Sequence, residues 1–110
     1  GRILFYATDT GPLGNDAWDT LGVLRDDGVR LNAVALDHTF GINERATGHL
    51  NAEQFGEEIA RLRHEGLLAE DCRSFAHHLA HHSNPPHPEL VEIGRAGGYE
   101  IAYDGLVVDV

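Results

Sequence analysis

Short apolar runs alternate with helical patterns along this chain, and this alternation limits the fold more than any other feature. Buried strands are predicted over residues 2–8, 31–36 and 69–76. Helices are predicted over residues 16–24, 51–65 and 88–95. Because strands that alternate with helices usually pair in parallel, the sequence predicts an α/β fold with a largely parallel sheet.

The helix that begins after Asn51 has the clearest pattern. Phe55, Ile59 and Leu62 recur at helical spacing and form an apolar stripe. Asn51 followed by Gln54 matches a capping box, in which each side chain accepts a hydrogen bond from the backbone amide of the other residue. This pattern predicts where the helix starts.

The end of the chain predicts a hairpin. Residues 99–103 and 106–110 are strand-like, and Asp104-Gly105 between them is a hairpin signal. The whole chain, residues 1–110, is interpreted as one domain, because its length allows a single small core.

The balance of charge is acidic, with 18 Asp and Glu residues against 8 Lys and Arg. This argues against nucleic acid or an anionic membrane as a partner. The partner that we expect is a small-molecule substrate. A single cysteine excludes an internal disulfide and fits a reducing, cytoplasmic compartment. No apolar run approaches the roughly 20 residues of a membrane span. Because the chain starts at Gly1 and has no methionine, we expect it to be a piece of a longer or processed chain.

Polar side chains follow the predicted strands at the points where the strands end. The first strand ends at Asp9, the second at Asp37, and the third at His77 and His78. If these strands are parallel neighbours, their polar ends gather along one edge, where the loop residue His49 can join them. An oxygen and nitrogen donor set of this kind suits zinc, manganese or iron(II).

Each of these residues also has a plain structural interpretation. Asp9 and Asp37 fit turn or capping residues, and His49 fits a solvated loop position. Five of the eight histidines lie within residues 74–87, where two prolines stop any regular element soon after His82. This stretch predicts either a metal site or an exposed, pH-sensitive surface patch.

Five motifs follow one another along the chain. They are Tyr6-Ala-Thr-Asp9-Thr-Gly11, Leu36-Asp37-His-Thr-Phe40-Gly41, Gly48-His49-Leu50, His78-Leu-Ala-His81 and Ala102-Tyr-Asp104-Gly105. In this order the chain resembles the C-terminal half of a metallo-β-lactamase-fold hydrolase. It is most similar to the phosphodiesterase-like branch of that superfamily, which includes the carbon–phosphorus lyase accessory phosphodiesterase.

The resemblance implies a site with two divalent metal ions, zinc first and manganese or iron as alternatives. Asp9 matches the aspartate that bridges both ions, and His78 matches the last histidine ligand. His49 matches a catalytic histidine that contacts the substrate phosphate or moves a proton. His81 matches a second histidine beside the last ligand, which supports that ligand or reaches the metal itself.

The resemblance also implies a four-layer αββα sandwich. Residues 1–110 match its C-terminal half, which is one sheet with helices on its outer face. The family's His-x-His-x-Asp-His motif lies upstream in relatives and is not in this chain, so we expect the N-terminal half to be missing. One Asp and one His fall short of the ligands that a catalytic zinc needs, and we therefore expect weak metal binding by this chain alone.

Half of such a sandwich exposes the inner face of its sheet. Ile3, Phe5, Val34 and Leu36 alternate in the manner of such strands. An exposed apolar face favours association, so we expect the isolated chain to form a homo-oligomer, to aggregate, or to pair with the missing half.

The function implied by the resemblance is part of a phosphodiesterase-type hydrolase, in which a metal-bound hydroxide attacks phosphorus. Two alternatives stay open. One is hydrolysis of a thioester, lactone or sulfate ester on the same fold. The other is a metal-free, non-enzymatic interaction module.

Overall fold

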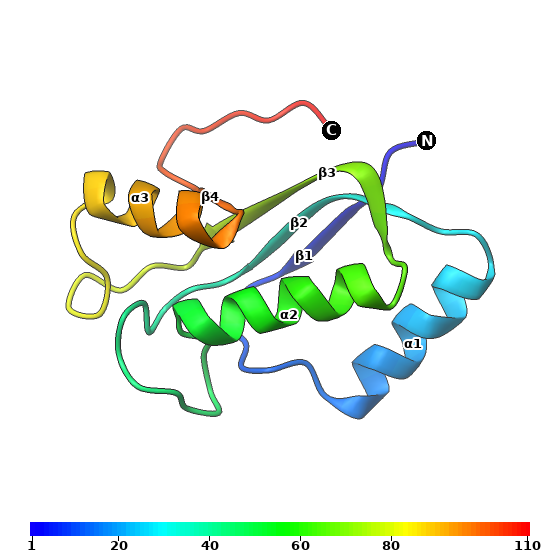
Figure 1. Cartoon of the computed structure of the whole chain (residues 1–110), viewed down its shortest axis with the longest axis horizontal. Helices are drawn as coiled ribbons and strands as arrows, with labels where there is room; N and C mark the ends of the chain where they lie inside the picture. The colour runs from blue at the N-terminus through cyan, green and yellow to red at the C-terminus, as the bar shows by residue number, and fades with distance from the viewer.

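A four-stranded parallel sheet forms the centre of the computed structural model, which describes residues 1–110. The elements in chain order are β1 (Leu4–Ala7), α1 (Asn15–Asp26), β2 (Leu31–Asp37), α2 (Ala52–His64), β3 (Leu68–His77), α3 (His87–Gly97) and β4 (Glu100–Ile101) (Figure 1). The strand order in the sheet is β1-β2-β3-β4, and all three pairings are parallel. This confirms the predicted α/β class. None of the helices is long and apolar enough to cross a bilayer.

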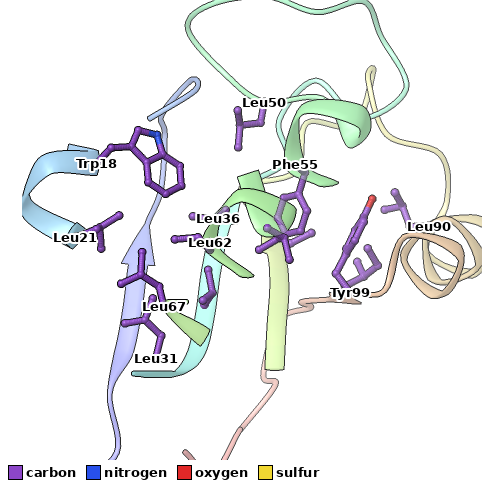
Figure 2. Packing of buried hydrophobic residues seen from close by; sticks show 14 residues of the cluster. Trp18, Leu21, Leu31, Leu36, Leu50, Phe55, Leu62, Leu67, Leu90 and Tyr99 are labelled. Atoms are coloured by element: carbon purple, nitrogen blue, oxygen red, sulfur yellow. The ribbon is translucent and has the colours of Figure 1, made fainter. Parts of the chain in front are cut away.

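All three helices bury residues in one core cluster against the same face of the sheet. The cluster includes Trp18 and Leu21 from α1, Phe55 from α2 and Leu90 from α3, packed over Leu36 of β2 (Figure 2). Burial of such side chains contributes about 1.5–3 kcal/mol each to folding. The helices therefore form one layer and the sheet another.

The predicted start of α2 is confirmed in detail. The side chain of Asn51 accepts a hydrogen bond from the backbone amide of Gln54 at 2.8 Å, and the Gln54 side chain accepts one from the Asn51 amide at 3.0 Å. Phe55, Ile59 and Leu62 are all buried, as their spacing predicts. The capping box therefore fixes the end of α2 that lies next to the loop of residues 38–51.

The predicted C-terminal hairpin is wrong. Its first strand is reduced to β4, which pairs in parallel with β3, and residues 106–110 form no strand. Asp104-Gly105 is still a turn, but the chain then crosses to the sheet face away from α1 and α2 (Figure 1). There Leu106 and Val108 pack against a small buried cluster of Ala33, Ala35 and Phe75. Both side chains are partly buried by this packing, which holds the segment against the sheet face and not beside β4.

The sheet face that the helices leave uncovered does not carry the residues that the sequence predicted for it. Phe5 packs against the main core cluster, and Val34 and Leu36 are buried within it. The side chains that remain exposed on strand β1 are Leu4, at 51 %, and Tyr6, at 62 %. The C-terminal segment covers the β2 and β3 part of this face but leaves β1 open.

We predict that the isolated chain self-associates through this open part of the sheet. Replacement of both exposed residues, Leu4→Thr with Tyr6→Thr, removes apolar surface from the face and keeps strand-compatible side chains. We expect the dissociation constant for self-association to rise at least tenfold, which corresponds to about 1.4 kcal/mol. Sedimentation velocity over a concentration series measures it.

The exposed Val23 of α1 provides the control, since Val23→Thr removes apolar surface away from the sheet. This variant should associate like the unmodified chain. A monodisperse monomer for the unmodified chain at every concentration would contradict the prediction.

Candidate metal centre

Four potential metal ligands converge where the parallel strands end. Asp9 follows β1, Asp37 is the last residue of β2, and His78 follows β3 directly. His49, from the loop that precedes α2, completes the group. One donor atom from each of these residues lies within 4.8 Å of the donor atoms of the others.

The two imidazoles face the carboxylates at close range. The Nδ1 atom of His49 lies 3.2 Å from Oδ1 of Asp37 and 3.5 Å from Oδ1 of Asp9. The Nδ1 atom of His78 lies 3.0 Å from the same oxygen of Asp37. The two rings are nearly parallel, with an interplanar angle of 18° and centroids 5.6 Å apart. These contacts bring the ends of three strands and one loop together at a single point.

Asp37 is the buried member of the centre, with a side-chain exposure of 0 %. Burial by itself raises the pKa of Asp37. Hydrogen bonds from the Leu50 amide, from the Thr39 hydroxyl and amide, and from His49 act in the opposite direction and hold the pKa below its usual value. Asp37 is therefore ionised at neutral pH despite its burial.

Asp9 and His78 are the only residues other than glycine with positive φ, at 52° and 57°. The left-handed region costs an L-residue about 1–2 kcal/mol, although Asp and His are found there more often than bulky residues. Strained backbone of this kind clusters at functional sites, because the surrounding structure has to hold it. The two predicted ligands are thus the two residues that the fold holds in an unfavourable conformation.

Gly11 allows the loop after β1 to approach the loop that carries His49. A Cβ atom at Gly11 would collide with the backbone carbonyl of Thr47, so a larger residue would force the two loops apart. This close approach brings Asp9 within reach of His49.

A buried histidine fastens the loop that follows β3. His38 is fully buried, with Nδ1 2.9 Å from Oδ1 of Asn84 and Nε2 2.9 Å from the Tyr99 hydroxyl. The Asn84 amide donates to the carbonyls of His38, Thr39 and Ala80, so its oxygen is the acceptor for His38 Nδ1–H. The Tyr99 hydroxyl consequently donates to Nε2. Burial lowers the pKa of His38, which stays neutral in this network.

A hollow of about 900 Å³ opens beside His78 at this edge of the sheet. His77, His81 and His87 line it together with Tyr103 and Asp104. His81 does not join the four-donor cluster and instead lies in the wall of the hollow. No helix forms at residues 77–82.

The sequence placed Asp37 among the polar groups at the strand ends, but its role was interpreted as that of a turn or capping residue, and it was not among the predicted site residues. Asp37 does accept a local bond from the Thr39 amide at 3.1 Å, but it also contacts both histidines of the centre. Its position at the end of a fully apolar strand was the available signal, because a carboxylate there is buried and needs partners. The structure brings Asp37 and His49 together with Asp9 and His78, the two metal ligands that the resemblance implied.

The chemistry of the donors fits a divalent cation. Two carboxylates and two imidazoles suit zinc, manganese or iron(II). The side chains of Asp9 and His78 are 67 % and 41 % exposed, which leaves a path for an ion to enter.

Comparison of the chain with protein-family models, with curated proteins and with solved structures finds no match. The function therefore has to be inferred from the geometry of this centre.

We predict opposite effects of Asp9→Gly on stability and on metal binding. Glycine removes the cost of positive φ, so without metal we expect the variant to be more stable by about 0.5–1 kcal/mol. It also removes one donor, so the rise in melting temperature that Zn²⁺ produces in the unmodified chain should largely disappear. Thermal unfolding with and without Zn²⁺ measures both effects.

His82→Ala provides the control, because His82 is exposed and lies outside the cluster. It should respond to Zn²⁺ like the unmodified chain. An equal zinc-induced shift in the Asp9→Gly variant would exclude Asp9 as a ligand.

We predict that Tyr99→Phe weakens the fold and changes its response to high pH. The variant leaves Nε2 of buried His38 without a donor, which costs about 1–3 kcal/mol. Burial raises the pKa of Tyr99 to about 12, above the usual value of 10. In the unmodified chain, Tyr99 thus contributes stability that is complete below pH 10 and is lost as the pH rises towards 12.

Urea unfolding between pH 8 and 12 tests this. The free energy of unfolding of the Tyr99→Phe variant should fall less between pH 10 and 12 than that of the unmodified chain, because the variant has no Tyr99 hydroxyl to ionise. The exposed Tyr103 serves as the matched control, since Tyr103→Phe removes no buried hydrogen bond. Equal stability of Tyr99→Phe and the unmodified chain at pH 8 would contradict the prediction.

Proposed function

We propose that this chain is part of a metal-dependent hydrolase that acts on phosphodiesters. The observation that carries the proposal is the convergence of Asp9, Asp37, His49 and His78 at the carboxyl edge of a parallel sheet. Open α/β sheets bind their ligands at this edge. The resemblance seen in the sequence supports the same class of reaction.

The charge of the centre explains why a cation is needed. The chain has a formal net charge of −10, and two carboxylates stand at the centre itself. A phosphodiester anion would be repelled there unless a bound cation reversed the local charge. When bound, a divalent ion supplies that charge and lowers the pKa of a water molecule.

The residues of the chain have separate roles in this proposal. Asp9 and His78 hold the ion, and both remain accessible from solvent. His49 lies beside them, in contact with Asp37 and in a T-shaped contact with the ring of Phe40, and it moves a proton or contacts a phosphate oxygen. The hollow beside His78 receives the rest of a small substrate.

A site with two ions would need more donors than these four, because a catalytic zinc usually takes three protein ligands and a solvent molecule. We propose that the further donors come from a pairing partner, which is either an additional segment of the same protein or another copy of the chain. Hydrolysis of a thioester, lactone or sulfate ester uses the same kind of centre, and a substrate panel separates these reactions.

We predict zinc- or manganese-dependent hydrolysis of bis(p-nitrophenyl) phosphate. The assay uses this chain and also the full product of its reading frame. Asp9→Asn and His78→Ala should each lower kcat/KM at least 100-fold, because each removes a ligand. His49→Ala should lower kcat by about 10²–10⁴, the usual contribution of a general acid or base.

His82→Ala, again an exposed neighbour outside the cluster, should keep full activity. Undiminished activity in both Asp9→Asn and His78→Ala would remove the assignment. Absence of bound metal after reconstitution, with no hydrolysis, would favour the non-enzymatic module instead.

A further inference from the structure

The two oxygens of Asp37 have different partners. Oδ2 accepts the backbone amides of Leu50 at 2.9 Å and Thr39 at 3.1 Å, which occupy both of its lone pairs. Oδ1 lies 2.8 Å from the Thr39 hydroxyl and faces Nδ1 of both His49 and His78, at 3.2 and 3.0 Å. One oxygen is thus held by the backbone, and the other faces the two imidazoles.

Each imidazole nitrogen that faces Asp37 is surrounded by acceptors. Nδ1 of His49 has a carboxylate oxygen of Asp37 on one side and one of Asp9, at 3.5 Å, on the other. Nδ1 of His78 lies next to Asp37 Oδ1 and 2.6 Å from the Thr39 hydroxyl. That hydroxyl has a single proton, and the Asp37 carboxylate and the carbonyl of His78 are both within its reach. A lone pair on Nδ1 of His49 would face two carboxylate oxygens, so this nitrogen donates to Asp37 Oδ1. Because the Thr39 hydroxyl gives its proton to Asp37 Oδ1, Nδ1 of His78 donates to the Thr39 oxygen, so both Nδ1 atoms carry a proton.

We propose that Asp37 is a positioning residue that fixes both His49 and His78 in the Nδ1–H tautomer and leaves both Nε2 atoms free for the ion and the substrate. Histidine ligands of metals commonly donate their other N–H to a carboxylate, which sets the tautomer and the orientation of the ring. Here one buried carboxylate orients two rings, His49 by a direct hydrogen bond and His78 through the Thr39 hydroxyl, and the two ring planes are nearly parallel, 18° apart.

The competing arrangement makes Asp37 a fourth metal ligand, with the ion bound by the Nδ1 atoms. In that case Oδ1 would have to hold the ion in addition to the Thr39 hydroxyl, inside a side chain that is 0 % exposed. The two arrangements differ in which imidazole nitrogen carries the proton, and this can be measured.

The experiment is long-range ¹H–¹⁵N NMR of the chain labelled with ¹⁵N-histidine, without metal, at pH 8, where an imidazole is ordinarily neutral. We expect the Nδ1–H tautomer for both His49 and His78. The Nε2–H tautomer at either residue overturns the proposal. After Zn²⁺ is added, the ¹⁵N shift of His78 should change mainly at Nε2, and a change at Nδ1 instead would also overturn it.

Asp37→Asn provides a sharper test. The Thr39 and Leu50 amides need an acceptor, so they take the single oxygen of the new side chain and turn its NH₂ group towards the two histidines. Both rings should then reverse to the Nε2–H tautomer, and zinc affinity should fall about 10–100-fold. Tautomers that stay unchanged in a folded Asp37→Asn variant would count against Asp37 as the residue that sets them.

Asp9→Asn is the matched control, since it changes a carboxylate of the same centre and leaves Asp37 in place. His78 should keep its Nδ1–H tautomer in this variant, and reversal there would overturn the proposal. If Asp37→Asn does not fold, the measurement on the unmodified chain still decides the question. The inference concerns the centre on which the proposed function rests, but the tautomers are read without substrate. A lack of hydrolysis would therefore overturn the proposed function alone.

Discussion

The ionised carboxylate of Asp37, buried at the end of β2, is the interaction on which the arrangement of this edge depends. It accepts backbone amides from Thr39 and Leu50 and faces imidazoles that come from two other segments. A buried charge without partners would cost several kcal/mol, so these contacts must form together or the strand end cannot be buried. The centre is therefore part of the fold and not an addition to its surface.

A second buried polar network holds the loop that contains His78 in place next to the Asp37 carboxylate. His38, next to Asp37 in the chain, joins Asn84 in the loop after β3 and Tyr99 just before β4. Because Asp37, the last residue of β2, and His38, which follows it, anchor the two networks, the metal centre and the wall of the adjoining hollow have a common support. The aromatic contact of Phe55 with Tyr99, at 4.3 Å between ring centroids, ties this support to the main core (Figure 2).

The centre also shows a conflict between stability and chemistry. Asp9 and His78 are held at positive φ, and the surface around them carries exposed carboxylate and imidazole groups instead of packed apolar side chains. A chain selected for stability alone would place glycine at these positions. The use of Asp and His there is the pattern expected where donor groups have to be presented to a ligand.

The sequence alone determined the elements of the fold that depend on local hydrogen bonds and periodicity. The Asn51–Gln54 capping box, the apolar stripe of α2 and the alternation of strands and helices all act over a few residues, and all three agree with the structure. It also placed Asp9 and His78 at strand ends. Tertiary structure decided the rest, because it depends on contacts between distant segments. The close approach of Gly11 to Thr47 brings His49 to Asp9, and burial against the sheet draws Leu106 and Val108 away from a hairpin. Only the packed sheet edge shows that Asp37 lies against two histidines, since no local pattern records which loops will meet there.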